Sequence, residues 1–293
     1  MAVWILYNPL AGGDCRETAE CLCVVLDEEP VLYDITKITN YATFLSGLEQ
    51  GDKLVIVGGD GTLNRFVNDT RHLDLTQEIC YFPCGTGNDF ACDLGQKTPG
   101  MPIPITDYLR SLPTVEVKGR QHRFVNAVGF GVDGYCCVRG DELRKEGKPI
   151  NYASIAVEGL LGRFRPVNAQ ITVDGTSHSF RRVWIAPTLH GRYYGGGMMA
   201  APQQDRTGET LSVVVFHTAG ALMTLLLFPK IFSGKHVRHR RYVTVLTGRE
   251  IAVRFDRPAP LQIDGETVED VECYTACAAQ RDRVDARKAA PGL

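Results

Sequence analysis

Short apolar runs followed by glycine-rich polar loops organise the first third of the chain. These units lie at residues 3–13, 54–62 and 79–89, and each loop leads into a helical pattern of apolar residues. The alternation is typical of a parallel α/β sheet, in which the carboxyl ends of the strands share one edge. We therefore expect the three loops to meet at that edge.

From about residue 118 onward, apolar and polar residues alternate instead. Examples are Ile171 with Val173, and Ile251 with Val253. Alternation is typical of strands that have one buried face, and Asp174-Gly175 predicts a hairpin turn between two of them. The second half of the chain is therefore predicted to form antiparallel sheet.

Composition limits the partners and the compartment. The 293 residues carry 32 Lys and Arg and 34 Asp and Glu, a formal net charge of -2, which indicates no nucleic-acid partner. The apolar start has no basic segment and is too short for a secretory signal, and the run 219–228 is well short of the ~20 residues that cross a bilayer. The 10 cysteines include no CxxC pair. We expect a cytoplasmic protein with reduced thiols.

The loop Gly58-Gly59-Asp60-Gly61-Thr62 is the first candidate site. Its glycines allow backbone amides to approach a phosphate closely, and Asp60 adds a carboxylate that can hold Mg²⁺. Thr62 is expected to cap the helix that follows. The alternative is a tight turn between strand and helix with an exposed Asp.

A second loop, Gly85-Thr86-Gly87-Asn88-Asp89, supplies mobile backbone, a hydroxyl, an amide and another acid. Two such loops in one α/β half, with Asn8-Pro9 and Gly12 at a third strand end, favour a shared nucleotide cleft. The chain has no GxxxxGK[ST], HRD or DFG, so neither a P-loop nor a protein kinase is indicated. Residues 129–134 match GxGxxG, but no clear first βαβ unit surrounds them.

Six motifs together resemble the bacterial diacylglycerol kinase family over nearly the whole chain. In chain order they are NPLAGG from Asn8, VGGDGTLN from Val57, PCGTGNDFA from Pro83, NAVGFGVDG from Asn126, YGGGMMAAP from Tyr194 and DGE from Asp264. GGDGT alone is shared with NAD kinases and sphingosine kinases. The GTGNDFA form, with GGG and a late DGE, is specific to the lipid kinase branch.

The resemblance implies an NAD-kinase-like α/β nucleotide-binding domain at 1–118 and an antiparallel β-sandwich domain at 119–275, with the active site between them. A tail at 276–293 would form a charged helix or return to the first domain. Magnesium would be organised by Asp60, Asp89 and Asp133. Glu266, as the base, and Asp60 would be the catalytic residues. The residues implied to contact ATP are Asn8, Pro9, Gly12, Thr36, Gly58, Gly59, Gly61, Thr62, Asn64, Gly85, Thr86 and Asn88. Without the family, Asp264-Gly265-Glu266 is most simply a hairpin.

The chain departs from the family pattern at two places. Relatives often have a basic residue where Gly13 stands, so Arg16 or a more distant residue would carry the phosphate charge. Relatives also have Asp-Asp-Gly before a Leu as a structural metal site, whereas this chain has Asp205-Arg206-Thr207-Gly208. A second metal is therefore not expected with the usual ligands.

Three functions fit the sequence: a lipid kinase that uses ATP and Mg²⁺, a soluble kinase acting on NAD or another small alcohol, and a nucleotide-binding regulator without catalysis. Intact Asp60 and Glu266 disfavour the last, and motif specificity favours the first. A lipid acceptor implies a peripheral membrane enzyme on an anionic surface. The oligomeric state is open, and a homodimer is compatible with the sequence.

The segment 222–232 is the expected membrane contact. Its apolar residues are Leu222, Leu225, Leu226, Leu227, Phe228, Ile231 and Phe232, and the basic residues that follow are Lys235, Arg238, Arg240 and Arg241. Packing of the leucines as core beside a solvated basic face is the alternative.

Overall fold

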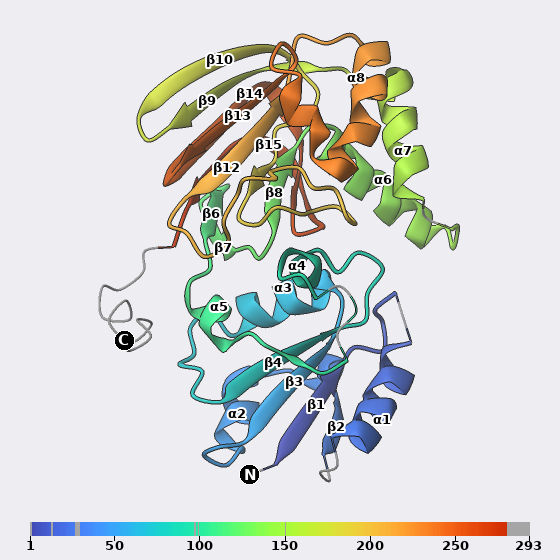
Figure 1. The fold of residues 1–293 in the computed structure, drawn as a ribbon, viewed down its shortest axis with the longest axis vertical. Helices are drawn as coiled ribbons and strands as arrows, with labels where there is room; N and C mark the ends of the chain where they lie inside the picture. Colours follow the sequence, from blue (N-terminus) through green and yellow to red (C-terminus); the bar gives the residue numbers. More distant parts are fainter. Residues whose placement is uncertain are drawn as a thin grey trace.

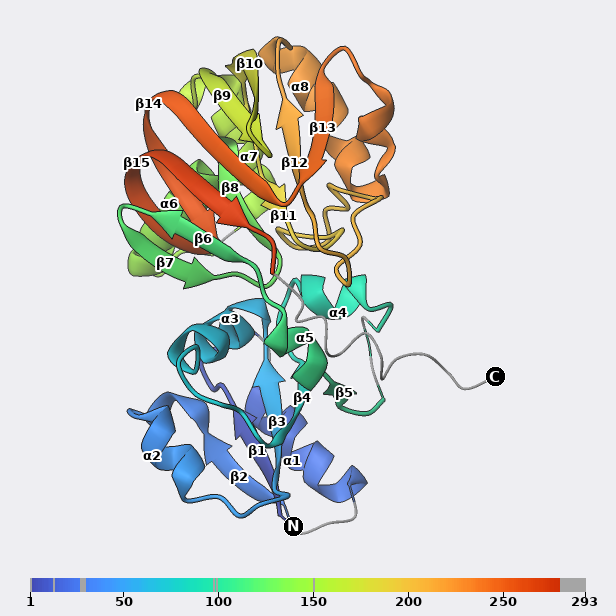
Figure 2. The same ribbon diagram turned by 90° about the vertical axis from the view of Figure 1, so that its left-hand side faces the viewer.

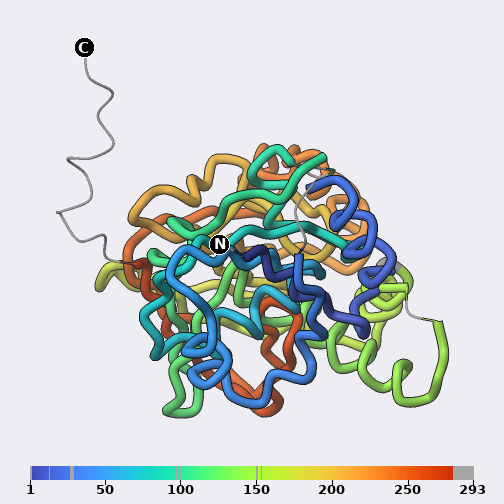
Figure 3. The backbone as a smooth tube through the Cα atoms, turned by 90° about the horizontal axis from the view of Figure 1, so that it is seen from below, coloured from blue at the N-terminus to red at the C-terminus, as the bar shows by residue number. Residues whose placement is uncertain are grey.

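Two domains are stacked along the long axis of the molecule (Figure 1). This computed structural model describes residues 2–12, 14–26, 30–96, 98, 100–149 and 151–279, except the side chain of Ala153. Most of the predicted tail, 280–293, lies outside the described residues, as does Gly13. In Figure 3 the molecule is seen from below, with the amino-terminal domain nearest the viewer.

The amino-terminal domain contains a sheet with strand order β2-β1-β3-β4-β5. Its strands are β1 (Val3–Tyr7), β2 (Val31–Asp34), β3 (Lys53–Gly58), β4 (Glu78–Pro83) and β5 (Ile103–Pro104). The first four are parallel, as predicted, and the short edge strand β5 is antiparallel to β4. The central strand β3 is buried over nearly its whole length, because helices cover both faces of the sheet.

Alternate residues of the strands meet different helices. Ile5 and Val55 pack on α1, whereas Leu6 and Ile56 pack on the side of α3. The helical segments are α1 (Cys15–Val25), η1 (Ile35–Lys37), α2 (Tyr41–Ser46), α3 (Asp60–Asp69), α4 (Asp89–Asp93) and α5 (Thr106–Arg110). In Figures 1 and 2, α3 and α4 occupy the end of this domain that faces the second domain.

The carboxy-terminal domain is built on antiparallel sheet with the path β13-β12-β11-β8-β14-β15-β6-β7, from which β9 and β10 branch at β14. Its strands are β6 (Thr114–Val117), β7 (Arg120–Arg123), β8 (Ala127–Phe130), β9 (Val167–Val173), β10 (Thr176–Val183), β11 (Thr188–Leu189), β12 (Leu211–Phe216), β13 (Val243–Gly248), β14 (Glu250–Ile263) and β15 (Glu266–Cys277). The predicted hairpin at Asp174-Gly175 is confirmed, because Val173 pairs with Thr176 across it.

The long strand β14 joins two parts of this sheet. Its first half pairs with β9, its last residues pair with β8, and its register with β15 shifts between Arg254 and Ala259. Pro258 and Pro260 lie in or beside this interval, and proline cannot donate to a ladder. The interrupted strand curls the sheet around a core that includes Phe130 and Phe255, stacked at 4.2 Å between ring centroids.

Helical segments cover another face of the sheet. They are α6 (Val132–Lys145), α7 (Tyr152–Glu158), η2 (Gly159–Arg163), α8 (Ala221–Leu227), η3 (Phe228–Ser233) and η4 (Lys235–Arg238). A separate apolar core between sheet and helices includes Trp184, Phe216 and Ile231. None of the helices in the described part of the chain has the length and apolar character needed to cross a membrane.

The predicted fold class is confirmed: an α/β domain precedes a domain of antiparallel sheet. The boundary at residue 118 stays a prediction, and we note that β6 and β7 are already hydrogen-bonded within the second sheet. The GxGxxG segment 129–134 spans the end of β8 and the first turn of α6. Since β8 belongs to antiparallel sheet, this segment is not part of a βαβ unit.

Candidate active site between the domains

The three glycine-rich loops meet as predicted. Asn8 Nδ2 donates to Thr62 Oγ1 at 2.8 Å, which ties the loop at Asn8 to the loop at Gly58. A Cβ built on Gly85 would lie only 2.6 Å from Gly59 Cα, so the loops at Gly58 and Gly85 are in close contact. A side chain at either glycine would push the loops apart. The carboxyl ends of β1, β3 and β4 therefore form one site.

Asp60 is held by three donors at this junction. Its carboxylate accepts from the backbone amides of Asp89 at 2.9 Å and Phe90 at 3.0 Å, and from Asn126 Nδ2 at 3.0 Å. The two amides begin α4, where helix N–H groups have no partner within the helix. Asp60 thus caps a helix that follows a different strand.

Thr62 does not cap α3. That helix begins at Asp60, its N-cap is Gly59, and Thr62 lies within its first turn. The prediction was wrong because the helix starts three residues earlier than the pattern suggested, and the hydroxyl instead accepts from Asn8.

Asp89 lies against the glycine loop of the second domain. Its carboxylate accepts from the amides of Gly196 at 2.8 Å and Gly197 at 2.6 Å. Burial, together with the negative charge of Asp60, raises the pKa of Asp89 to about 7. A Cβ on Gly87 would lie 3.5 Å from Asp60 Oδ2 and 3.7 Å from Asp89 Oδ2, so both carboxylates face the same small space.

This pair of carboxylates fits Mg²⁺. The ion prefers hard oxygen ligands and commonly takes one or two carboxylates together with substrate phosphates. Each carboxylate has about four acceptor positions, so the hydrogen bonds of Asp60 and Asp89 leave room for an ion. Within the described residues, no three His, Cys, Asp or Glu side chains form a metal cluster.

Asp133 has different surroundings. It lies in the first turn of α6, is half-buried, and accepts from the Tyr194 hydroxyl at 3.1 Å on both oxygens. Burial raises the pKa of Asp133 to about 7. The structure therefore pairs Asp133 with a tyrosine, and its predicted part in organising Mg²⁺ stays a prediction.

The DGE motif forms the hairpin that the residues alone indicated. Asp264 and Gly265 adopt positive φ values of 46° and 94° between β14 and β15. Glu266 is more than half exposed and pairs with Arg65 of α3 at 3.1 Å. Arg65 lies about 7.5 Å further along α3 than Asp60, at the helical rise of about 1.5 Å per residue.

Asp264 is a site residue that sequence reasoning missed. Its carboxylate accepts from the amides of Val125, Asn126 and Ala127 at 2.5, 2.8 and 2.9 Å and from Asn64 Nδ2 at 2.8 Å. The DGE motif indicated Glu266 as the functional acid. The contacts of Asp264 come from residues that are distant in the chain, so the motif did not reveal them.

The other residues predicted to contact ATP lie in or near these loops. Asn88 adopts φ 53°. Its side chain accepts from Gly85 N and donates to Gly85 O, both at 2.9 Å, and so stabilises the conformation of this loop. Thr36 lies in η1 after β2, and its amide and hydroxyl donate to the carboxylate of Asp34. Arg16 lies on α1 and pairs with Glu20. Their contacts with a nucleotide stay predictions.

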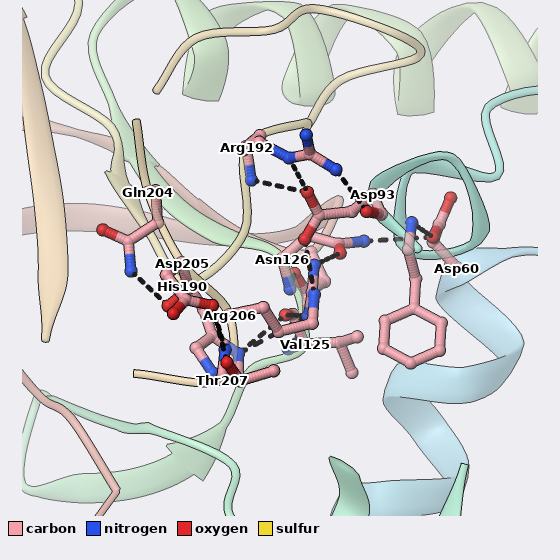
Figure 4. Close-up of polar contacts among 12 residues, drawn as sticks. Asp60, Asp93, Val125, Asn126, His190, Arg192, Gln204, Asp205, Arg206 and Thr207 are labelled. Carbon is pink, nitrogen blue, oxygen red and sulfur yellow. Dashed lines mark hydrogen bonds and ion pairs between the residues drawn. The ribbon is translucent and has the colours of Figure 1, made fainter. Parts of the chain in front are cut away.

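A buried ionic cluster joins the domains beside Asp60 (Figure 4). Asp93 of α4 accepts from Arg192 Nε at 2.8 Å and from Arg206 Nε at 2.7 Å, both in loops of the second domain. Sequence reasoning missed Asp93 and Arg192 and noted Arg206 only as a departure. The spacing of Asp89 and Asp93, one helical turn apart, is the signal that could have found Asp93.

Comparison with known proteins agrees with this architecture. Residues 2–117 match the diacylglycerol kinase catalytic domain, and residues 126–281, more than half of the chain, match the YegS C-terminal NAD kinase beta sandwich-like domain. Fold and matches define the class, a two-domain kinase-type protein. The chain belongs to the diacylglycerol kinase family, in the branch that carries the YegS carboxy-terminal domain.

Individual relatives are distant. The chain is 26% identical over 234 residues to YtlR of Bacillus subtilis, covering 73% of this chain and 74% of YtlR. It is 24% identical over 281 residues to the diacylglycerol kinase of Bacillus subtilis, covering 89% and 88%. A solved diacylglycerol kinase structure from Bacillus anthracis strain Sterne superposes with a TM-score of 0.61 over 95% of this chain and 94% of that chain at 16% identity, which shows the shared fold.

Proposed function

We propose that this protein transfers the γ-phosphate of ATP to a hydroxyl group of a lipid, with Mg²⁺ bound beside Asp60 and Asp89. The observation that carries the proposal is the convergence of these two carboxylates next to Gly87, where the glycine-rich loops meet. Oxygen ligands at a phosphate-binding loop are the arrangement that phosphoryl transfer uses. The names of the relatives indicate the lipid kinase class.

In this mechanism the loops at Gly58, Gly85 and Gly12 hold the phosphates through backbone amides. Bound Mg²⁺ would neutralise charge on the transferred group. Glu266 accepts the proton of the lipid hydroxyl as its oxygen bonds to the γ-phosphorus and ADP leaves. Asp60, fixed by three donors, keeps the metal-binding carboxylate in one orientation.

A labelled-ATP assay tests the proposal. Purified protein is incubated with γ-labelled ATP and Mg²⁺ in mixed vesicles of a bacterial lipid extract, and products are separated into lipid and water phases. We expect a labelled lipid that disappears with EDTA and in Asp60→Asn. Label only in a water-soluble product would support the soluble kinase instead, and ATP binding without any transfer would support the regulator.

We further propose that the enzyme docks on membranes through an apolar patch formed by α8 and η2, which are in contact with each other. The patch consists of Leu161, Leu222, Met223 and Leu226, with exposed fractions of 67%, 72%, 38% and 60%. The two segments lie beside each other in Figure 1. Exposed apolar surface of this kind is typical of a contact with a partner or a membrane.

The predicted membrane segment, residues 222–232, thus has one face buried in the core and one exposed face. Leu227 and Ile231 are buried in the core, Leu225 and Phe228 are partly buried, and Phe232 is exposed. Basic side chains lie in or follow these segments in the chain: Arg163 lies in η2, and Lys235, Arg238, Arg240 and Arg241 are exposed after η3. Leucines that enter the headgroup region beside cations favour an anionic leaflet.

A further inference from the structure

Arg206 is a buried cation in a loop between β11 and β12. Its side chain is 3% exposed, and its guanidinium carbon lies 4.7 Å from the centroid of the Phe90 ring. Three of its nitrogens donate to different groups: Nε to Asp93 Oδ2 at 2.7 Å, Nη1 to Val125 O at 2.5 Å and Nη2 to Asn126 Oδ1 at 2.8 Å. The planar group is therefore fixed in one orientation (Figure 4).

The ion pair with Asp93 is charged on both sides. Burial disfavours the ionised carboxylate, but the charge of Arg206 and the hydrogen bonds from Arg192 and Arg206 hold the pKa of Asp93 below its usual range. A carboxylate and a guanidinium that are both 3% exposed require each other, because neither is solvated by water. Arg206 accordingly occupies a set position between the two domains.

This position determines the orientation of the Asn126 amide. A guanidinium has donors only, so the atom of Asn126 that faces it must be the carbonyl oxygen. The NH₂ group of Asn126 then points the other way, where it donates to Asp60 Oδ1 at 3.0 Å. A flipped amide would place two donors against each other at Arg206 and an oxygen against the carboxylate of Asp60.

We propose that Arg206 is a positioning residue for the metal-binding carboxylate: it holds Asn126 so that the amide donates to Asp60 and fixes its orientation. The inference rests on the proposed function in so far as Asp60 binds Mg²⁺. Arg206 also contacts α4, through Asp93 and the Phe90 ring, so the route through Asn126 has to be separated from the contact with α4. Groups that orient a metal ligand typically change metal affinity by about 10- to 100-fold when they are removed.

The first test follows the Asn126 amide and needs no enzymatic activity. In protein labelled with ¹⁵N-asparagine, the side-chain NH₂ signal of Asn126, assigned by its absence in Asn126→Ala, should exchange slowly with solvent. In Arg206→Lys the exchange should become at least tenfold faster, because an ammonium cannot reach Asp93, Val125 and Asn126 together. Unchanged exchange in a folded Arg206→Lys protein would overturn the inference.

The second test measures binding of Mn²⁺, used as a spectroscopic probe for Mg²⁺, in the presence of ATP. Arg206→Lys should weaken Mn²⁺ binding at least tenfold while the affinity for metal-free ATP stays within twofold. Arg192→Gln is the matched control, because it removes another donor to Asp93 but does not contact Asn126. Equal losses in both variants would show that only the domain contact matters and would overturn the inference.

Asn126→Ala keeps the test decisive if Arg206→Lys does not fold. It removes the donor to Asp60 and leaves the pair between Arg206 and Asp93 intact, so it should reproduce the Mn²⁺ defect. Parent-like Mn²⁺ affinity in Asn126→Ala would refute the route through Asn126. If the parent protein transfers no phosphate to any lipid, the proposed function fails, but the amide exchange still decides the role of Arg206.

Discussion

Asn64 of α3 donates to the carboxylate of Asp264 at 2.8 Å, across 200 positions of sequence and from one domain to the other. The same carboxylate accepts the amides of Val125, Asn126 and Ala127. Asp264 therefore connects the start of β8 to helix α3 of the amino-terminal domain.

Replacing Asp264 should cost stability. Asp264→Ala leaves three backbone amides and Asn64 without their acceptor in a partly buried place, and we expect a loss of about 3–5 kcal/mol in the free energy of unfolding. Asp264→Asn should cost less, since Asn tolerates the positive φ and keeps one acceptor oxygen. Urea unfolding followed by circular dichroism measures both. Parent-like stability of Asp264→Ala would contradict the role of this residue.

Asp60→Asn should abolish phosphoryl transfer while the protein stays folded. The amide lacks the charge needed for Mg²⁺. Its NH₂ group would face an N–H donor that the carboxylate oxygen had accepted, which costs about 1–2 kcal/mol of stability. ADP release and the melting temperature are measured on the same sample. Full activity would remove the proposed metal site, and a modest loss would point to Asp89 as the principal ligand.

Glu266→Gln should lower kcat by about a hundredfold or more with nearly unchanged affinity for Mg-ATP, as expected for loss of a general base. Stability should not change, because exposed ion pairs contribute at most about 1 kcal/mol. Arg65→Gln is the control: it breaks the same pair and leaves the carboxylate. If both variants lose activity equally, the pair is needed for structure and the base lies elsewhere.

His190 should make the protein acid-sensitive. Burial and the charge of Arg206 lower the pKa of His190 to about 3. Below pH 6.5 the unfolded chain binds a proton that the folded protein does not, so stability rises with pH between about 3 and 6.5 and is level above that. The loss from pH 7 to pH 4 is about 3 kcal/mol for this group.

The measurement compares the parent with His190→Gln by urea unfolding at pH 4 and pH 7. The difference between the two pH values should be smaller in the variant by about that amount, whatever the absolute cost of the substitution. An identical pH difference in both proteins would mean that His190 becomes protonated in the folded state.

Vesicle sedimentation tests the membrane patch. The triple variant Leu161→Ser, Leu222→Ser, Leu226→Ser should weaken binding to anionic vesicles at least tenfold at every salt concentration, because burial of each leucine contributes about 1.5–3 kcal/mol. Changing Arg238, Arg240 and Arg241 to Ser should weaken binding mainly at low salt. Val24→Ser with Val25→Ser, exposed apolar positions on α1, is the matched control. An equal loss in this control would argue against a defined patch.

The local pattern of the chain determined the architecture and the meeting of the loops. Apolar runs of strand length placed β1, β3 and β4, and because parallel strands end at one edge, the loops at Asn8, Asp60 and Gly85 had to converge. Six motifs in a fixed order were enough to indicate the family. These features depend on residues that are close together in the chain, so the sequence alone predicts them.

Only the tertiary structure decided which distant side chains complete the site. Asp93, Asn126, Arg206 and Asp264 lie in four separate segments, and the bonds that join Asn126 to Asp60, Arg206 to Asp93 and Asp264 to Asn64 form only when the second domain packs on α3 and α4. From the sequence, Arg206 was only a departure from a family motif, and Asp264 was only one residue of a predicted hairpin turn. Burial gave them their roles, because a charge removed from water must find its partner wherever the fold places one.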